Sequence, residues 1–342
     1  MSDPLNRLAP VVRLAPAKLN LTLAVIGPRP DGYHALHSVA VPLGLADRLS
    51  LAPAPGGRDT LHVAGRDAGP VEANLVLRAV AATRRAVGRS WLGPASPPPL
   101  AVRLEKRIPV AAGLGGGSSD AAAAIDGALE AWGAELDPAT RLAVALELGS
   151  DVPFFLAGGP ALVEGRGERV TPLAPLRGEP PGVLLVTPAV AVRTPEVFAA
   201  WAAGVRPAGA GAARASSEHL AAELRAGLAA LDLLRRASVL AAANDLLPAT
   251  LALVPGLVAF RRALARLLGR PIGQSGSGPS CFVLYPSLAA AAAAGDLVRE
   301  ALRDERLPRL GSDDPAVEPT TILAGTGAPA PGDVTVVGRS ER

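Results

Sequence analysis

The chain has 342 residues and a formal net charge of +3, and 49% of its residues are apolar. This length allows one large domain or two medium ones, and the small, scattered charge argues against a nucleic-acid partner. A single cysteine, Cys281, excludes an internal disulfide framework, and no apolar run reaches the roughly 20 residues that a membrane span requires. We therefore expect a cytoplasmic protein with no membrane partner.

Alternating apolar residues and helical periodicity predict a mixture of strands and helices. Strands are predicted at residues 13–25, 39–43, 48–51, 60–63, 100–106, 182–187 and 281–285. Helices are predicted at residues 74–87, 118–132, 138–148, 218–234, 256–268 and 288–302. The two kinds of element do not alternate regularly, which indicates an α+β fold rather than a doubly wound one.

Lysine is rare in this chain. Of the 34 basic residues only Lys18 and Lys106 are lysines, and all the others are arginines. An ammonium group is a compact charge whereas a guanidinium group is a planar fork, so each lysine marks a position that could require the smaller cation. The alternative for each of them is an ordinary surface lysine.

A glycine-rich loop joins the strand at 100–106 to the helix at 118–132. It reads Pro109-Val-Ala-Ala-Gly-Leu-Gly-Gly-Gly-Ser-Ser-Asp-Ala121. Free amides at the start of a helix favour an anion, and serine hydroxyls can bind phosphate oxygens or a phosphate-bound Mg²⁺. A Walker A loop is excluded because Gly117, not lysine, precedes Ser118, and the third glycine of a dinucleotide fingerprint is absent. The alternative is a flexible loop that ends in a Ser-Ser-Asp cap.

This loop resembles the signature of the GHMP kinases, and the likeness extends over residues 14–302. Its enlarged glycine run is most similar to the branch that phosphorylates a cytidine diphosphate-linked methylerythritol, a small-molecule substrate. The resemblance implies a two-domain GHMP kinase fold with the active site in the interdomain cleft, ATP as cofactor, and Mg²⁺ with Ser119 as a candidate ligand. The nucleotide-binding residues that it implies are Pro109, Ala111, Gly113, Leu114, Gly115, Gly116, Gly117, Ser118, Ser119 and Asn74, although Asn74 could equally be a helix cap.

Two further motifs supply a catalytic pair. Ala15-Pro-Ala-Lys18-Leu-Asn20 resembles the first family motif, and Gly149-Ser-Asp151-Val-Pro-Phe resembles the segment that carries the catalytic carboxylate. The resemblance implies that Asp151 accepts the hydroxyl proton and that Lys18 keeps this carboxylate ionised and stabilises charge on the attacking oxygen. Taken alone, Lys18 fits a strand-end salt bridge and Asp151 a cap or turn residue.

The acceptor side is implied by a turn and a second glycine loop. In Pro30-Asp-Gly-Tyr33-His34 the tyrosine would stack on the cytosine, worth roughly 1–3 kcal/mol, and the histidine would contact the base. Gly276 and Ser277 of the second loop, with Asn20 and Asp151, would complete the substrate site. Some family members place another aromatic residue after the strand at 182–187, but residues 190–194 contain none. Taken alone, the two segments fit a turn with a half-buried tyrosine and a tight hairpin.

We expect an ATP-binding domain over residues 1–176 and a second domain over residues 177–342. The second contains a Gly/Ala/Pro-rich insertion near 204–217, predicted to be flexible, and an extended tail after 305 that could add a strand at 334–337. The protein is expected to be a monomer or a weak homodimer. Two alternatives remain, a homoserine or mevalonate type of kinase and a non-catalytic nucleotide-binding module, and the Tyr33–His34 motif argues against the first.

Overall fold

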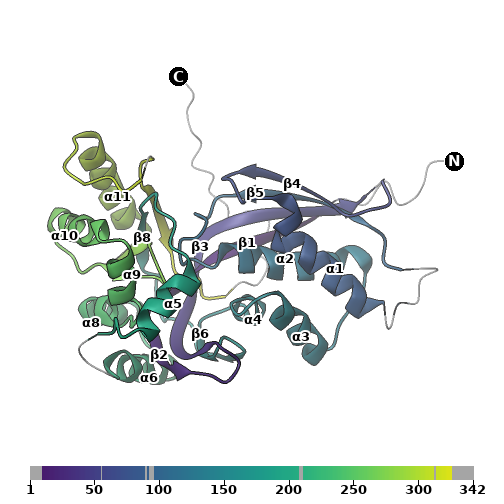
Figure 1. The fold of residues 1–342 in the computed structure, drawn as a ribbon, viewed down its shortest axis with the longest axis horizontal. Helices are drawn as coiled ribbons and strands as arrows, with labels where there is room; N and C mark the ends of the chain where they lie inside the picture. Colours follow the sequence, from purple (N-terminus) through teal and green to yellow (C-terminus); the bar gives the residue numbers. More distant parts are fainter. Residues whose placement is uncertain are drawn as a thin grey trace.

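The computed structural model describes residues 10–54, 56–88, 91, 96–207, 211–311 and 313–325. In these ranges the chain forms one sheet of seven strands and another of four. The two sheets lie side by side along the long axis of the molecule, each with its own helices (Figure 1). This mixture confirms the α+β prediction. Within the described residues no helix is long and apolar enough to cross a membrane.

The seven-stranded sheet is built on one 20-residue strand, β3 (His34–Pro53). Its order is β4-β5-β3-β6-β7, and β1 and β2 also pair with β3. The other strands are β1 (Val11–Asn20), β2 (Ala24–Pro28), β4 (Thr60–Gly65), β5 (Leu100–Lys106), β6 (Ala161–Gly165) and β7 (Arg169–Pro172).

Two predictions about these strands were wrong. Residues 39–43 and 48–51 belong to the single strand β3, because a bulge at residues 43–45, which lie opposite Ala17 of β1, absorbs the irregularity without breaking the pairing. Residues 13–25 instead form parts of two strands, β1 and β2.

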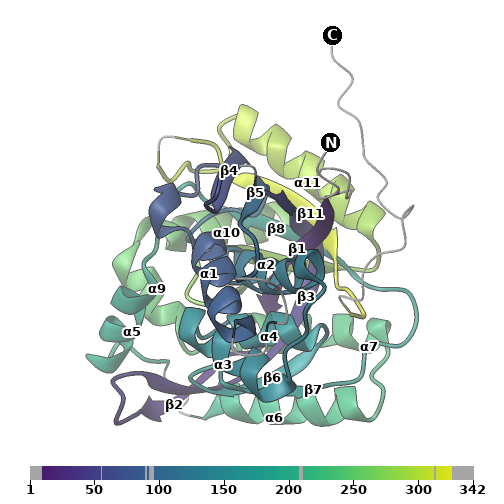
Figure 2. The same ribbon diagram turned by 90° about the vertical axis from the view of Figure 1, so that its right-hand side faces the viewer.

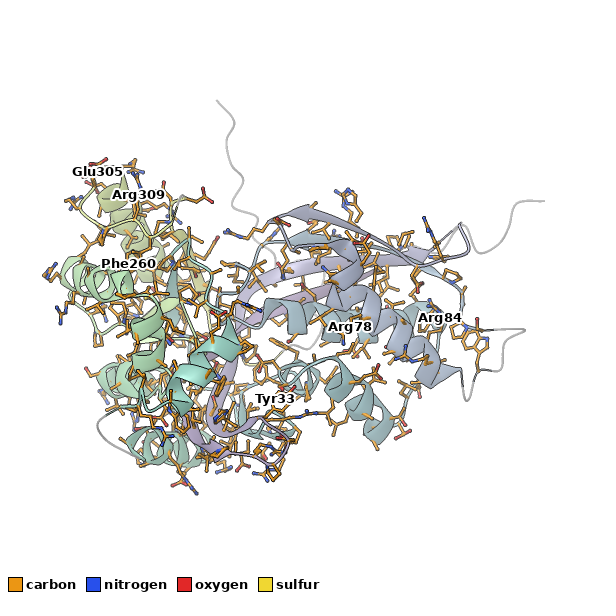
Figure 3. The ribbon with its side chains drawn as sticks, viewed as in Figure 1. Tyr33, Arg78, Arg84, Phe260, Glu305 and Arg309 are labelled. Atoms are coloured by element: carbon orange, nitrogen blue, oxygen red, sulfur yellow. The ribbon has the colours of Figure 1, made fainter. Side chains whose placement is uncertain are left out.

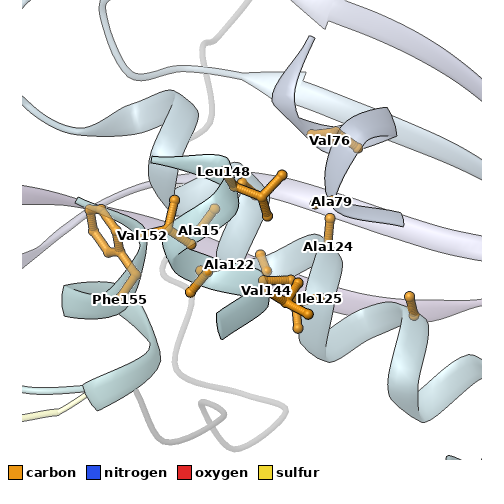
Figure 4. Packing of buried hydrophobic residues seen from close by; sticks show 14 of the residues in the cluster. Ala15, Val76, Ala79, Ala122, Ala124, Ile125, Val144, Leu148, Val152 and Phe155 are labelled. Carbon is orange, nitrogen blue, oxygen red and sulfur yellow. The ribbon is translucent and has the colours of Figure 1, made fainter. Parts of the chain in front are cut away.

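Four helices cover one face of this sheet (Figures 1 and 2). They are α1 (Leu75–Val87), α2 (Gly116–Trp132), α3 (Pro138–Leu148) and α4 (Val152–Ala157). The central helix α2 carries small residues, so it approaches its neighbours closely, and Figure 4 shows Ala124 beside Ala79 and Val76 of α1. A Cβ atom at Gly127 would lie 2.5 Å from a methyl carbon of Leu51 on β3. This close packing holds α2 against the sheet.

The second sheet has the order β11-β8-β10-β9. Its strands are β8 (Gly182–Thr187), β9 (Gly273–Gln274), β10 (Cys281–Tyr285) and β11 (Ala316–Thr321). The helices of this half are α5 (Thr194–Ala202), α6 (Ala212–Arg225), α7 (Ala230–Arg235), α8 (Ala237–Ala242), α9 (Leu247–Leu253), α10 (Gly256–Leu268) and α11 (Leu288–Arg303). Phe260 of α10, labelled in Figure 3, is fully buried in a cluster with Val298 of α11 and Leu184 of β8.

Three predictions for this half need correction. Residues 212–217 of the predicted flexible insertion begin helix α6, and Ser217 is fully buried with its hydroxyl 2.9 Å from Nδ1 of His37. The single helix predicted at 218–234 is split into α6 and α7. The tail after 305 contains β11, which pairs with β8.

The boundary between the two predicted domains stays a prediction. The first sheet ends at Pro172 and the second begins at Gly182, which fits a division at 176/177. However, one hydrophobic cluster joins Leu19 and Leu43 of the first sheet to Val183 and Leu284 of the second. The strand suggested at 334–337 lies outside the described residues.

Gly182, the first residue of β8, provides a test of this packing. A Cβ atom there would lie 2.0 Å from the carbonyl oxygen of Ser287, a backbone atom that cannot rotate away. We expect Gly182→Ala to lower the free energy of unfolding by about 1–3 kcal/mol in urea denaturation. Gly56→Ala is the matched control, since nothing lies within 4 Å of a Cβ atom at that position. Equal stability of the two variants would contradict the packing described here.

Candidate active site

A cavity of about 420 Å³ lies where the glycine loop, β1, the start of α4 and the second glycine loop meet. Both halves of the chain contribute to its wall. The predicted site residues that line it are Lys18, Asn20, Asn74, Pro109, Ala111, Gly113, Leu114, Gly115, Gly116, Gly117, Ser118, Asp151, Gly276 and Ser277. The remaining three predicted site residues, Ser119, Tyr33 and His34, do not line the cavity, although each lies within three positions of a residue that does.

The predicted catalytic pair is brought together across the sheet edge. Nζ of Lys18 lies 3.9 Å from Oδ2 of Asp151, and it also donates a hydrogen bond to Oδ1 of Asn20. Nδ2 of Asn20 donates in turn to the hydroxyl of Ser38 at 2.8 Å, which fixes the amide. The Lys18 side chain is 8% exposed and that of Asp151 is 48% exposed, so the ammonium is held in place while the carboxylate faces open space.

Asp151 stands at the start of α4, but its side chain makes no capping hydrogen bond there. The helix-cap alternative for this residue is therefore not observed, and the carboxylate is available to a ligand. The preceding residue, Ser150, packs against the β6–β7 hairpin, where a Cβ atom at Gly167 would lie 2.2 Å from its carbonyl oxygen. This contact anchors the Asp151 backbone beside the cavity.

The first glycine loop needs its glycines at two positions. Gly113 and Gly115 have φ of +76° and +69°, a region that side chains disfavour. A Cβ atom at Gly115 would lie 2.9 Å from Cγ of Lys18, and one at Gly113 would lie 2.2 Å from the carbonyl oxygen of Ser275. The backbone amide of Lys18 donates to the carbonyl of Leu114 at 2.9 Å. The loop is thus fastened to β1 beside the lysine.

The second glycine loop supports the first from the other half of the chain. The hydroxyl of Ser275 donates to the carbonyl of Gly113 at 2.9 Å and accepts from the amide of Asn20 at 3.3 Å. Nδ2 of Asn244 donates to the carbonyls of Gln274 and Gly276 at 3.0 and 2.9 Å, which holds the second loop in turn. The tight-hairpin alternative therefore accounts for only part of what this loop does.

The start of α2 carries buried polar atoms without a partner. The helix has 17 residues, and its first three, Gly116, Gly117 and Ser118, line the cavity. The hydroxyl of Ser119, 1% exposed, and Oδ1 of Asp120 have no hydrogen-bond partner among the described residues. Free amides, a helix dipole and an orphaned hydroxyl form a site that suits a phosphate group with its metal ion.

Asp120 also belongs to a buried ionic cluster with Lys106 and Asp47. The ammonium of Lys106 donates to both carboxylates, and its side chain is 3% exposed, so the surface-lysine alternative is wrong. Burial raises the pKa of Asp120 to about 7, although the neighbouring ammonium opposes this shift.

Asn74 caps the start of helix α1, which is one of the two roles predicted for it. Its side chain accepts a hydrogen bond from the amide of Val76 at 3.0 Å at the start of α1. The residue also lines the cavity, so a contact with a bound nucleotide stays a prediction.

The predicted acceptor turn carries two rings, those of His34 and of Tyr33, and the second is labelled in Figure 3. Tyr33 is 51% exposed, and the guanidinium carbon of Arg166 lies 5.2 Å from its ring centroid. The ring of His34 is stacked on Phe198 with centroids 5.3 Å apart, and the edge of Trp201 lies against it at 5.5 Å. Phe198 and Arg166 both line the cavity.

Sequence reasoning missed Phe198 and Arg166. The search for a second aromatic residue ended at residue 194, whereas Phe198 lies one helical turn further on, in α5. The chain contains only five phenylalanines, and this rarity was an available signal. Arg166 lies in the Gly-Arg-Gly-Glu turn between β6 and β7, and no local pattern predicts that this turn lies beside Tyr33.

Comparisons of sequence and structure relate the chain to small-molecule kinases. Residues 74–159 match the family model described as GHMP kinases N terminal domain. The 4-diphosphocytidyl-2-C-methyl-D-erythritol kinase of Pelotomaculum thermopropionicum is 40% identical over 284 residues, 82% of this chain and 91% of that protein. The protein of the same name from Rhizobium meliloti is 38% identical over 292 residues, 83% of this chain and 89% of that protein.

Solved structures agree with these relatives. A crystal structure of 4-(cytidine 5'-diphospho)-2C-methyl-D-erythritol kinase has a TM-score of 0.62 at 34% identity and covers 91% of this chain and 99% of that chain. The homoserine kinase of Cytophaga hutchinsonii has a TM-score of 0.64 at 19% identity and covers 94% and 96% of the two chains. That second likeness shows the fold alone.

The contact between the two glycine loops can be tested by substitution. Gly113→Ala places a Cβ atom against the backbone of Ser275 at a positive φ, so we expect the free energy of unfolding to fall by about 2 kcal/mol or more. At Gly117 the nearest atom to a Cβ would be a methyl carbon of Leu75 at 3.8 Å, so Gly117→Ala should change stability by less than about 1 kcal/mol. Urea denaturation of both variants measures the difference, and equal losses would refute the loop contact.

Proposed function

Because the chain belongs to the 4-diphosphocytidyl-2-C-methyl-D-erythritol kinases of the GHMP superfamily, we propose that Asp151 and Lys18 carry out its phosphoryl transfer. The enzyme phosphorylates the 2-hydroxyl of 4-diphosphocytidyl-2-C-methyl-D-erythritol with ATP, giving the 2-phosphate and ADP. This is a step of the methylerythritol phosphate pathway to isoprenoid precursors. The homoserine and mevalonate alternatives are not favoured, since a mevalonate kinase structure is only 12% identical to this chain.

The separation of Lys18 and Asp151 is the observation that carries the proposed mechanism. Transfer to an alcohol needs a carboxylate that accepts the hydroxyl proton and orients the oxygen toward the γ-phosphate. Asp151 is exposed to the cavity and uncapped, and at 3.9 Å the ammonium of Lys18 is near enough to stabilise the charge that develops on the oxygen. Asn20 and Ser38 hold Lys18 in this position, which limits reorganisation during the reaction.

We place the triphosphate of ATP at the start of α2, over the first glycine loop. The positive φ of Gly113 and Gly115 brings the loop backbone close to the cavity, and the amides of Gly116 to Ser118 are free because they begin the helix. Asn74 and Pro109 line the same cavity and would contact the nucleoside part.

Mg²⁺ would neutralise charge on the phosphate oxygens of bound ATP. Ser119 stays the candidate ligand because its buried hydroxyl has a free lone pair, although this residue lies behind the cavity wall that its neighbour Ser118 lines. Among the described residues there is no group of three His, Cys, Asp or Glu side chains that could hold a metal ion. The phosphates and water would therefore supply most of the ligands, as Mg²⁺ prefers.

The cytidine diphosphate half of the acceptor would lie at the Tyr33–His34 turn. Tyr33 offers an exposed ring, and Phe198 offers a second ring in the wall of the cavity, held by its stacking on His34. Arg166 lines the cavity beside Tyr33 and makes no ion pair among the described residues, so it can pair with the acceptor's negative charge. Gly276 and Ser277 would complete this side near Lys18.

Substitution of the catalytic pair tests the mechanism. We expect Asp151→Asn and Lys18→Met each to lower kcat by about 10² to 10⁴ in an assay of ADP release with 4-diphosphocytidyl-2-C-methyl-D-erythritol. Asp151 is largely exposed, so Asp151→Asn should unfold within a few degrees of the wild type. A folded Asp151→Asn enzyme with near-normal turnover would refute the role of Asp151. Phosphorylation of homoserine or mevalonate, with none of the cytidyl substrate, would refute the substrate assignment.

Phe198 provides a separate test of the acceptor side. We expect Phe198→Ala to raise the KM for the cytidyl substrate by about tenfold, since a ring stacked on a base is lost, while the KM for ATP stays unchanged. Phe198→Tyr retains a ring and is the matched control, for which the KM should remain close to that of the wild type. Equal changes in the two KM values of Phe198→Ala would place the ring outside the acceptor site.

A further inference from the structure

The buried ionic cluster of Lys106, Asp47 and Asp120 has no part in the mechanism described above. The ammonium of Lys106 donates to Oδ2 of Asp47 and, at 2.6 Å, to Oδ2 of Asp120. None of the three side chains is more than 3% exposed. Two carboxylates share one cation, and burying charge in this way costs free energy that packing with apolar residues would avoid. The cluster therefore calls for a physical reason other than stability alone.

Its position supplies that reason, because it is attached to the chain on both sides of the first glycine loop. Oδ1 of Asp47 accepts hydrogen bonds from the backbone amides of Arg107 and Ile108, the two residues that precede Pro109. These bonds fix the stem through which the chain enters the loop.

The stem through which the chain leaves the loop is held by the same ammonium. Asp120 lies in the first turns of α2, and Nζ of Lys106 would lie 2.9 Å from a Cβ atom at Gly116, the first residue of that helix. The ammonium thus lies directly against the helix start, whose first three residues line the cavity. Lys106 and Asp120 are themselves part of the cavity wall.

We propose that Lys106 is a positioning residue for the ATP site, which sets the spacing of the two loop stems by binding Asp47 on one side and Asp120 on the other. This inference rests on the proposed placement of ATP at the first glycine loop. The loop amides can bind phosphate only if the entry at Ile108 and the exit at Gly116 keep a fixed separation. The ammonium already lies 2.9 Å from where a Cβ atom at Gly116 would stand, so a larger guanidinium would press on the helix start, which gives a reason for lysine in a chain rich in arginine.

Two substitutions at Asp120 separate positioning from simple stability. Asp120→Ala removes the bond from Lys106 to α2 and leaves the Lys106–Asp47 pair intact. Asp120→Asn keeps an oxygen that can accept from Lys106, and because Oδ1 has no partner, an amide nitrogen in its place breaks no existing bond. We expect Asp120→Ala to raise the KM for ATP by about tenfold and to leave the KM for the cytidyl substrate within about twofold, with Asp120→Asn close to wild type in both.

Isothermal titration calorimetry of the full-length protein with ADP, without the acceptor, measures nucleotide affinity directly. This measurement does not depend on the identity of the acceptor substrate. A wild-type protein that binds no ADP would refute the proposed function itself. A wild-type protein that binds ADP, with a folded Asp120→Ala variant that binds it equally well, would refute only the positioning role. A lower melting temperature with unchanged ADP affinity would likewise assign the cluster to stability alone.

Lys106→Arg decides the question should Asp120→Ala fail to fold. It keeps both carboxylates and the positive charge, and changes only the size and shape of the cation beneath Gly116. We expect its affinity for ADP to fall by about tenfold because the helix start is displaced. An affinity equal to that of the wild type, in a folded protein, would overturn the proposal.

Discussion

The site depends on the contact between two backbones at Gly113 and Ser275. These residues are far apart in the sequence and belong to different halves of the chain, and a side chain at Gly113 would fill the space that Ser275 occupies. The serine hydroxyl bridges Gly113 and Asn20, so one contact joins the first glycine loop, β1 and the second loop. Because hydrophobic residues of both sheets share a cluster behind this contact, the two halves form a common wall for the cavity rather than two separate surfaces.

Two lysine–carboxylate groups lie near that contact, and they differ in how far they are exposed. Beside the cavity, the exposed carboxylate of Asp151 lies 3.9 Å from the ammonium of Lys18 and stays open to the cavity. Beneath the loop, the carboxylates around Lys106 are buried and bound directly. The first arrangement keeps a reactive group available, whereas the second resists movement, because opening it would leave charges buried without partners. A phosphoryl-transfer site needs both properties, an accessible base and a rigid cradle.

The sequence predicted those features that local interactions determine. The strand Leu100–Lys106, the helix Pro138–Leu148 and the glycine loop between strand and helix follow from periodicity and from glycine chemistry, and their predicted bounds match closely. The continuity of β3 could not be read locally, because β3 bulges at residues 43–45 and is held in the sheet there by its pairing with β1 on both sides of the bulge. Phe198 was missed for a similar reason: its position depends on how α5 returns to His34, a contact between residues 164 positions apart.

The two lysines show how much of their role can be predicted from composition alone. Their rarity marked both as positions that could need a compact cation, but it could not separate a catalytic group from a buried one. In the structure the two lysines differ in which glycine packs against them and in how far the ammonium is enclosed. Gly115 passes over the stem of Lys18, whose ammonium remains beside the open carboxylate of Asp151, and Gly116 lies over Lys106, whose ammonium is enclosed. Successive glycines of one loop therefore make room for two different lysines, so the absence of their side chains is needed for the packing of both cations.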